Sequence, residues 1–289
     1  MAEKIVEVRE LRGNRIELII KGFNVAYVNA IRRLILSDVP TMAVDFAYFY
    51  ENSTDVYDEM IAHRLGLLVL KSDEALSKYA SPEACADSQP PNPKCFVEMF
   101  LDIGLEESAP TGFYVKASEF KISDPSISPV YPDTPITYIA PGQRLHVVAY
   151  ARLGRGREHA KWSPASLSVL RYTPIVSYDA SKATKGCLEC VKAYGEVLEA
   201  LRKGGSGFIE LYGLVNTGGL RYCAETSCKN AINIRYDPSI LQLIVEGTGA
   251  LKPERIVYEA TKVLEDKVKT LKGMISWLGV KRVEKNRAH

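Results

Sequence analysis

An apolar stripe near the C-terminus constrains this chain more than any other sequence feature. After Pro253, which suits the first turn of a helix, apolar side chains recur at steps of three and four residues. They are Val257, Ala260, Leu264, Val268, Leu271, Ile275 and Leu278. The spacing predicts one amphipathic helix of about six turns. One small domain is too short to cover it, so part of the stripe is expected to face a partner. Packing on the chain's own N-terminal sheet is the other interpretation, and the two are compatible.

The preceding chain predicts an α+β fold. A β-hairpin is expected at residues 4–11 and 15–21, because both segments are rich in β-formers and Arg12-Gly13-Asn14 suits a turn. Asn24 is a suitable N-cap for a helix at 25–37, which ends before Pro40. A shorter helix is expected at 58–65 and a surface insertion at 72–95. Strands are expected at 41–50, 96–103, 113–122, 136–139, 145–153 and 167–176.

Residues 179–230 form a block of their own, which contains four of the six cysteines. A helix is expected at 188–202, followed by a glycine-rich turn and a strand at 208–215. Strands at 232–236 and 240–246 then lead to the C-terminal helix. A chain of 289 residues has room for about two domains and a third small one.

The charge balance argues against independent binding of nucleic acid. The chain has 37 basic and 35 acidic side chains and a net charge of +2, whereas proteins that hold nucleic acid alone usually carry a basic stripe or excess. The N-terminus lacks the apolar core of a signal peptide, and no run of about 18 apolar residues predicts a membrane span. The chain is therefore expected in the cytoplasm, in contact with nucleic acid only through partners.

No catalytic motif appears in the sequence. A phosphate-binding glycine loop, a dinucleotide fingerprint and a Gly-x-Ser-x-Gly elbow are all absent. The histidines, His63, His146, His159 and His289, have no second ligand at metal-site spacing. The sequence therefore gives no support for an active site in this chain.

Four cysteines have spacings that admit several kinds of chemistry. Cys187 and Cys190 form a C-x2-C pair, and Cys223 and Cys228 form a C-x4-C pair further along the chain. Thiolates so placed can converge on zinc or an iron–sulfur cluster. Disulfides, which occur inside hyperthermophile cells, and buried free thiols are the alternatives. A cluster would make the chain a redox or electron-transfer protein, and zinc would make it a metal-stabilised interaction module.

The remaining two cysteines, Cys85 and Cys95, lie within the insertion at 72–95 and have no further metal-type ligand beside them. A disulfide that closes this loop is therefore predicted.

A charged loop at residues 154–164 has the highest density of residue types that are common at functional sites. It contains two glycines, four charged side chains, His159 and Trp162. A solvated hairpin loop is one interpretation. The other is an interface, because an exposed tryptophan beside basic residues is typical of an interface anchor, and glycines let the backbone approach another chain closely.

Several of these segments resemble the alpha-like family of RNA polymerase subunits, which comprises bacterial alpha, the archaeal protein known as D and the eukaryotic third subunit. The segment Asn29–Pro40, NAIRRLILSDVP, resembles the family signature. The segment Asp58–Leu67, DEMIAHRLGL, looks like the archaeal and eukaryotic form. Gly154–Gly156, Trp162–Pro164 and Glu246–Leu251 are also similar to the family. These segments follow the family order along nearly the whole chain.

The resemblance implies an assembly subunit of the archaeal D type, with three domains. The dimerisation domain would comprise residues 1–46 and 238–289, and would pair with the smaller alpha-like subunit L. An inserted β-rich domain would comprise 47–175 and 229–237. A ferredoxin-like domain would comprise 176–228. The dimer would be the platform on which the small subunit N and the large subunit called B assemble.

The resemblance also implies which residues form the interfaces. The second arginine of the signature helix, Arg33, with Arg32 beside it, would contact the large subunit. The loop would face B, with N nearby, and the C-terminal stripe would pack on L. The implied interface residues are Arg32, Arg33, Gly154, Arg155, Gly156, His159, Trp162, Leu264, Val268, Leu271 and Ile275.

The cysteine block departs from the family pattern. Cluster-binding archaeal members have C-x2-C-x2-C runs, but here Ala193 stands three residues after Cys190, and Val197 stands four residues further on. The spacing of Cys223 and Cys228 also differs. An ordinary four-iron cluster is therefore not assured, and the domain is expected to keep a ferredoxin-like shape.

Overall fold

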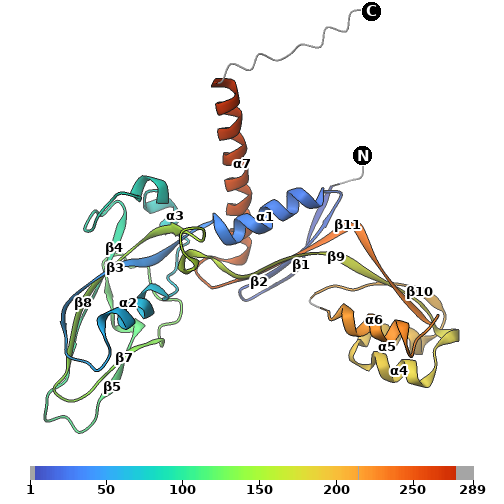
Figure 1. Ribbon diagram of the computed structural model, residues 1–289, viewed down its shortest axis with the longest axis horizontal. Helices are drawn as coiled ribbons and strands as arrows, with labels where there is room; N and C mark the ends of the chain where they lie inside the picture. Colours follow the sequence, from blue (N-terminus) through green and yellow to red (C-terminus); the bar gives the residue numbers. More distant parts are fainter. Residues whose placement is uncertain (1–3, 214, 278–289) are drawn as a thin grey trace, which may run out of the picture. The chain divides into compact units, whose positions relative to one another are not determined.

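A computed structural model describes residues 4–213 and 215–277 of the chain (Figure 1). The chain divides into two compact units, one within residues 1–32 and 167–245, the other within 33–166 and 246–289. Both units combine helices with antiparallel strands, which confirms the α+β class.

The first unit contains a five-stranded sheet of order β1-β2-β11-β9-β10. The predicted hairpin is confirmed as β1 (Ile5–Arg12) and β2 (Arg15–Lys21). The longer strands are β9 (Ala165–Asp179) and β11 (Ile232–Gly247), and β10 (Ser206–Glu210) lies at the edge. Two separate strands were expected where β11 runs, but the chain stays extended through Pro238, because the residue before a proline is held in the extended region.

Helix α1 (Val25–Ser37) begins and ends where the sequence predicted. The Asn24 side chain accepts a hydrogen bond from the Ala26 amide at 2.8 Å, which caps the first turn. Val28, Ile31 and Ile35 recur at helical spacing and are buried. This local pattern explains why the helix forms here.

The cysteine block has its own core, in which Val176, Val191 and Leu220 are fully buried. The single helix expected at 188–202 is wrong. Its place is taken by α4 (Lys185–Cys190), a 3-10 turn (Val191–Ala193) and α5 (Gly195–Lys203), because the backbone leaves the helical region at Tyr194. Helix α6 (Thr217–Glu225) was not predicted, and β10 ends five residues before the expected end of its strand.

The second unit is built on a four-stranded sheet of order β3-β8-β4-β6 and a two-stranded sheet, β5-β7. The strands are β3 (Pro40–Asn52), β4 (Phe96–Gly104), β5 (Phe113–Lys116), β6 (Lys121–Ile122), β7 (Pro135–Ile139) and β8 (Arg144–Arg155). The expected strand at 113–122 is thus interrupted, by a 3-10 turn at Ala117–Glu119. One face of the larger sheet is buried, and helix α2 (Asp58–Gly66) packs on this core through Ile61 and Leu65.

Four further elements complete the second unit. The insertion contains α3 (Ala75–Lys78) and the 3-10 turn η1 (Pro82–Cys85), and the charged loop contains η3 (Ala160–Trp162). Helix α7 (Pro253–Trp277) confirms the predicted C-terminal helix and extends beyond the sheet of its own unit (Figure 1). Leu278 of the predicted stripe lies outside the described residues.

Candidate subunit interface

The stripe on α7 is buried at one end of the helix and exposed at the other. Ala260 in the second turn is fully buried, and Leu264 is half-buried. Beyond it, Val268 is 51% exposed, Leu271 is 57% exposed and Ile275 is 46% exposed. We call Leu264, Val268, Leu271 and Ile275 the α7 stripe. Its exposed part offers a narrow apolar surface that this chain does not cover within the described residues.

Ion pairs hold α7 beside the end of α1 and the insertion. Lys267 Nζ lies 2.7 Å from Asp38 Oδ1, and Arg157 Nη1 lies 3.3 Å from the same oxygen. Glu83 in η1 pairs with Arg155 Nε at 2.7 Å and with Arg157 Nη2 at 3.3 Å. These residues line a cavity of about 320 Å³, whose wall is completed by α7 residues including Leu271 and Met274.

Asp38 is the centre of this network. Its side chain is only 7% exposed, and burial disfavours the charged carboxyl. Hydrogen bonds from Lys267 and Ser37 and the charges of Lys267 and Arg157 outweigh burial, and hold the pKa of Asp38 below its ordinary value. The network was not predicted, because its members come from four distant parts of the sequence.

Replacing Lys267 by glutamine should lower the free energy of unfolding at pH 7 by about 1 kcal/mol, because a nearly buried carboxylate loses a direct partner. Since the pKa of Asp38 is depressed in the folded state, its contribution is present above the unfolded pKa of about 4 and is lost as the pH falls through the folded value. The difference between wild type and variant should therefore shrink below about pH 4.

Thermal unfolding from pH 3 to 7 measures this difference. Lys269→Gln is the matched control, because Lys269 pairs at 2.7 Å with Glu265, and both side chains are exposed. A Lys267→Gln variant as stable as the Lys269→Gln variant at pH 7 would show that the Asp38 network does not hold α7.

The expectation that Trp162 is exposed is wrong. Its side chain is 3% exposed, and its Nε1 donates to the Arg152 carbonyl at 3.2 Å. The Arg152 guanidinium and the Lys161 ammonium lie 4.5 Å and 4.2 Å from the ring centroid. Both cations also contact Asp45, at 2.6 Å and 2.9 Å. The tryptophan therefore fastens the loop to β3 and β8, and is not an exposed anchor.

The two loop glycines are explained by packing within the chain. A Cβ at Gly154 would overlap the Trp162 ring, and a Cβ at Gly156 would overlap the Leu36 carbonyl oxygen. The close approach expected of these glycines is therefore made to this chain itself. Arg155 is largely buried and donates to the Asp38 carbonyl as well as to Glu83. His159 is exposed, and its Nδ1 accepts from the Lys161 amide at 3.0 Å.

The two signature arginines differ in their surroundings. The half-buried Arg32 donates to Asn29 at 2.8 Å and to the Ser168 carbonyl at 3.4 Å. Arg33 is exposed, and no ion pair of its guanidinium is formed within the described residues. Of the two, Arg33 is the more available for another chain.

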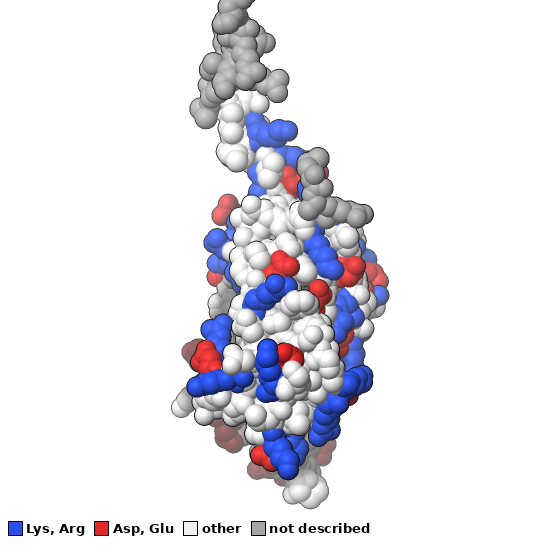
Figure 2. Space-filling view, turned by 90° about the vertical axis from the view of Figure 1, so that its right-hand side faces the viewer, with Lys and Arg blue, Asp and Glu red and all other residues white. Residues whose placement is uncertain are grey.

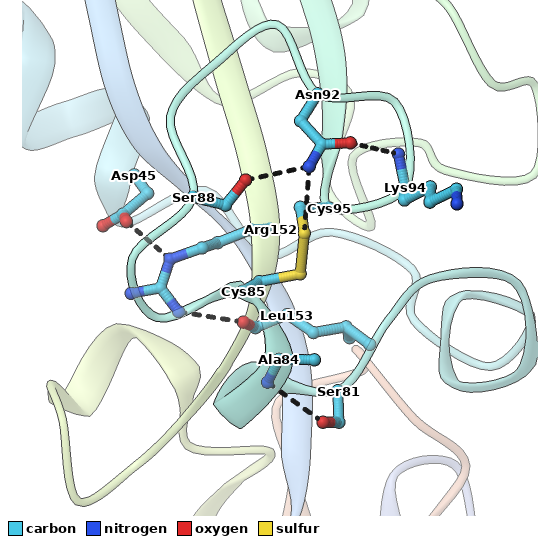
Figure 3. The surroundings of a disulfide bond; sticks show 10 residues. All are labelled: Asp45, Ser81, Ala84, Cys85, Ser88, Asn92, Lys94, Cys95, Arg152 and Leu153. Atoms are coloured by element: carbon cyan, nitrogen blue, oxygen red, sulfur yellow. Dashed lines mark hydrogen bonds and ion pairs between the residues drawn. A yellow bond between two sulfur atoms is a disulfide. The ribbon is translucent and has the colours of Figure 1, made fainter.

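The disulfide predicted between Cys85 and Cys95 is present (Figure 3). Ser81 caps η1 by accepting from the Ala84 amide at 3.3 Å. Asn92 donates to Ser88 at 2.9 Å. The two sulfurs are buried with Phe96. The disulfide therefore fixes the loop that carries Glu83.

The other four cysteines form two disulfides, Cys187–Cys228 and Cys190–Cys223. These pairings contradict the cluster and zinc interpretations of the four cysteines. Both interpretations require thiolates, whereas the four sulfurs are bonded to one another in pairs. Within residues 4–213 and 215–277, no group of three or more histidine, cysteine or acidic side chains is placed to hold a metal ion.

The distribution of charged side chains on the surface agrees with the small net charge of the chain. In the view of Figure 2, basic and acidic side chains are interspersed, without a continuous basic area. None of the described helices is both long enough and apolar enough to span a membrane.

Comparisons with known proteins point to one family. The family model described as the RNA polymerase Rpb3/Rpb11 dimerisation domain matches residues 17–268. The DNA-directed RNA polymerase subunit Rpo3 of Aeropyrum pernix is 58% identical over 96% of this chain and 97% of its own length. The Rpo3 subunit of Methanothermobacter thermautotrophicus is 29% identical over 91% of this chain and 95% of its own length. The DNA-directed RNA polymerase II subunit rpb3 of Dictyostelium discoideum is 28% identical over 94% of each chain.

Proposed function

Since this chain belongs to the RNA polymerase Rpb3/Rpb11 dimerisation-domain family, we propose that it is a non-catalytic assembly subunit of a cytoplasmic archaeal RNA polymerase. It pairs with the smaller alpha-like subunit L, and the pair is the platform for subunits N and B. The similarity to archaeal Rpo3 proteins over nearly the full length of both chains supports this role.

The exposed part of the α7 stripe is the observation that carries the proposal. Val268, Leu271 and Ile275 stand at steps of three and four on one side of a helix that no other described element covers at this end. Removing apolar area from water stabilises by about 25 cal/mol per Å². A second helix laid along the stripe would bury these side chains in the manner of a helix pair.

The three-domain division inferred from the sequence belongs to this proposal. The β-rich domain at 47–175 has support in one continuous core that includes Met99 and Leu145. The domain at 176–228 has support in a separate core around its two disulfides. Residues 1–46 and 238–289 would form the dimerisation domain, with α1 and α7 as its helices.

Co-expression with subunit L tests the pairing. Light scattering after size-exclusion chromatography should show a one-to-one complex, whereas the chain alone should self-associate through its exposed stripe. A well-behaved monomer that remains monomeric when L is added would contradict the proposed function.

Replacing Arg33 by alanine should leave the pair with L intact and weaken binding of the large subunit by about 30-fold, or ~2 kcal/mol. The reason is that a carboxylate of the large subunit would lose its guanidinium partner, and a guanidinium can form two parallel hydrogen bonds with a carboxylate. The measurement is the affinity of purified B for the preformed pair. Arg202→Ala removes an exposed arginine near the end of α5 and is the control. Equal affinities of the two variants for B would remove the assigned role of Arg33.

A further inference from the structure

A row of aromatic side chains lies on the outer face of the β3-β8-β4-β6 sheet. The ring centroids of Tyr48 and Tyr150 are 5.9 Å apart, and those of Tyr50 and His146 are 4.9 Å apart. Phe100 continues the row at 5.4 Å from His146. None of these rings belongs to the core on the other side of the sheet or to the α7 stripe.

One end of this row is covered by the chain itself. Phe46 and Phe96 meet at 5.7 Å and pack with the Cys85–Cys95 disulfide of the insertion. The other end is open, since Tyr48 is 45% exposed and Tyr50 is 69% exposed. The same row of aromatic residues is thus buried under a loop at one end and exposed to water at the other. Exposed aromatic side chains clustered in this way are typical of interface cores.

The charged side chains on this face of the sheet indicate the chemistry of the partner. Arg144 is engaged within the chain, because Asp102 binds it at 2.9 Å and Glu51 lies 3.4 Å away. Glu98 accepts a hydrogen bond from the Tyr150 hydroxyl at 3.1 Å. Among the described residues, no cation lies within ion-pair distance of Glu98. A carboxylate without an ion-pair partner therefore lies beside Tyr150, whose ring contacts that of Tyr48.

We propose that this surface, which we call the aromatic face (Tyr48, Tyr50, Glu98, Phe100, His146 and Tyr150), binds an arginine-bearing segment of another polymerase subunit. A guanidinium can stack on the tyrosine rings and pair with Glu98 at the same time. The inference rests on the proposed function for the identity of the assembly. A nucleic acid fits poorly, because its phosphates would face Glu51, Glu98 and Asp102. Among the described residues, the cations on this face are Arg144, which is already engaged, and Lys121, which lies near Asp102, so a second copy offers Glu98 no free guanidinium.

Nitration of tyrosine by tetranitromethane, read by mass spectrometry, tests the aromatic face. The reaction is compared in the pair with L and in polymerase reconstituted from purified subunits. Tyr50 should react at least about 5-fold more slowly in the polymerase, because a covering segment excludes the reagent and the solvent. Equal reaction of Tyr50 in both samples would overturn the inference and leave the proposed function standing. If the chain fails to assemble into the polymerase, both the inference and the proposed function are contradicted.

A variant of Glu98 tests the charge of the partner. In polymerase that contains Glu98→Gln, Tyr50 should regain much of its reactivity, because the guanidinium loses its carboxylate. Glu106→Gln, at an exposed glutamate in the loop after β4, is the control and should leave Tyr50 protected. Unchanged protection in Glu98→Gln polymerase would contradict an arginine-bearing partner. Protection that disappears after nuclease treatment would assign the face to nucleic acid instead.

Discussion

Replacing Leu271 and Ile275 together by glutamate should weaken binding of subunit L by about 1000-fold, or ~4 kcal/mol. Both side chains are about half exposed in this chain, so the substitutions should not disturb its fold. In the proposed pair they lie under a partner helix, where each apolar side chain contributes about 2 kcal/mol, and a buried unpaired carboxylate is unfavourable. The affinity is measured by titration calorimetry with purified L.

The control for this pair of substitutions is Gly273→Glu. Gly273 lies on the opposite side of α7, and a Cβ added there would meet nothing within 4 Å. It introduces the same carboxylate into the same part of the helix and should leave the affinity for L nearly unchanged. If the double variant binds L as tightly as the Gly273→Glu protein, the α7 stripe is not the surface that L covers.

Removal of the Cys187–Cys228 disulfide should have the second large effect. The two cysteines are 41 residues apart in the sequence, and opening a loop of this length lowers stability by ~4 kcal/mol in the chain-entropy description. Cys187 and Cys228 also lie within the small core of the block, which therefore loses packing in a double serine variant. Residues 176–228 should then open far more often than in the wild-type chain.

Hydrogen exchange measured by mass spectrometry reports this opening locally, without the assumption that the whole chain unfolds in one step. The matched control is the double serine variant of Cys85 and Cys95, which opens a loop with a separation of 10 residues in the other unit. This control variant should speed amide hydrogen exchange around η1 and leave the amides of residues 176–228 protected. Wild-type protection of the block in the variant of Cys187 and Cys228 would show that its fold does not depend on this disulfide.

Elements with strong local signals could be predicted from the sequence. Helix α1 has a capping asparagine at one end and Pro40 shortly after the other, and its apolar residues recur at helical spacing. The first hairpin has a clear turn between two β-rich segments. The length and apolar side of α7 were also evident, because they depend only on residue spacing. The cysteine spacing left disulfides and metal binding as alternatives.

Features that depend on tertiary contacts could not be predicted. The order of residues around Trp162 resembles an interface anchor, yet Arg152 and Lys161 enclose its ring and Asp45 neutralises both cations. No proline near Tyr194 indicates in the sequence that the helix is interrupted there. Asp38, Glu83 and Lys267 are distant in the sequence, so no motif could reveal their network. The aromatic face appears only when strand register brings β3 and β4 beside β8.

Hydrogen exchange of residues 271–276, which lie beyond the Lys267–Asp38 ion pair, tests the central claim most directly when it is measured with and without subunit L. In the chain alone, this end of α7 has only exposed side chains, so its amides should exchange quickly through fraying of the helix. When L is bound, the same amides should become strongly protected. If L binds while exchange at these residues stays as fast as before, another surface forms the pair, and the proposed role of α7 is contradicted.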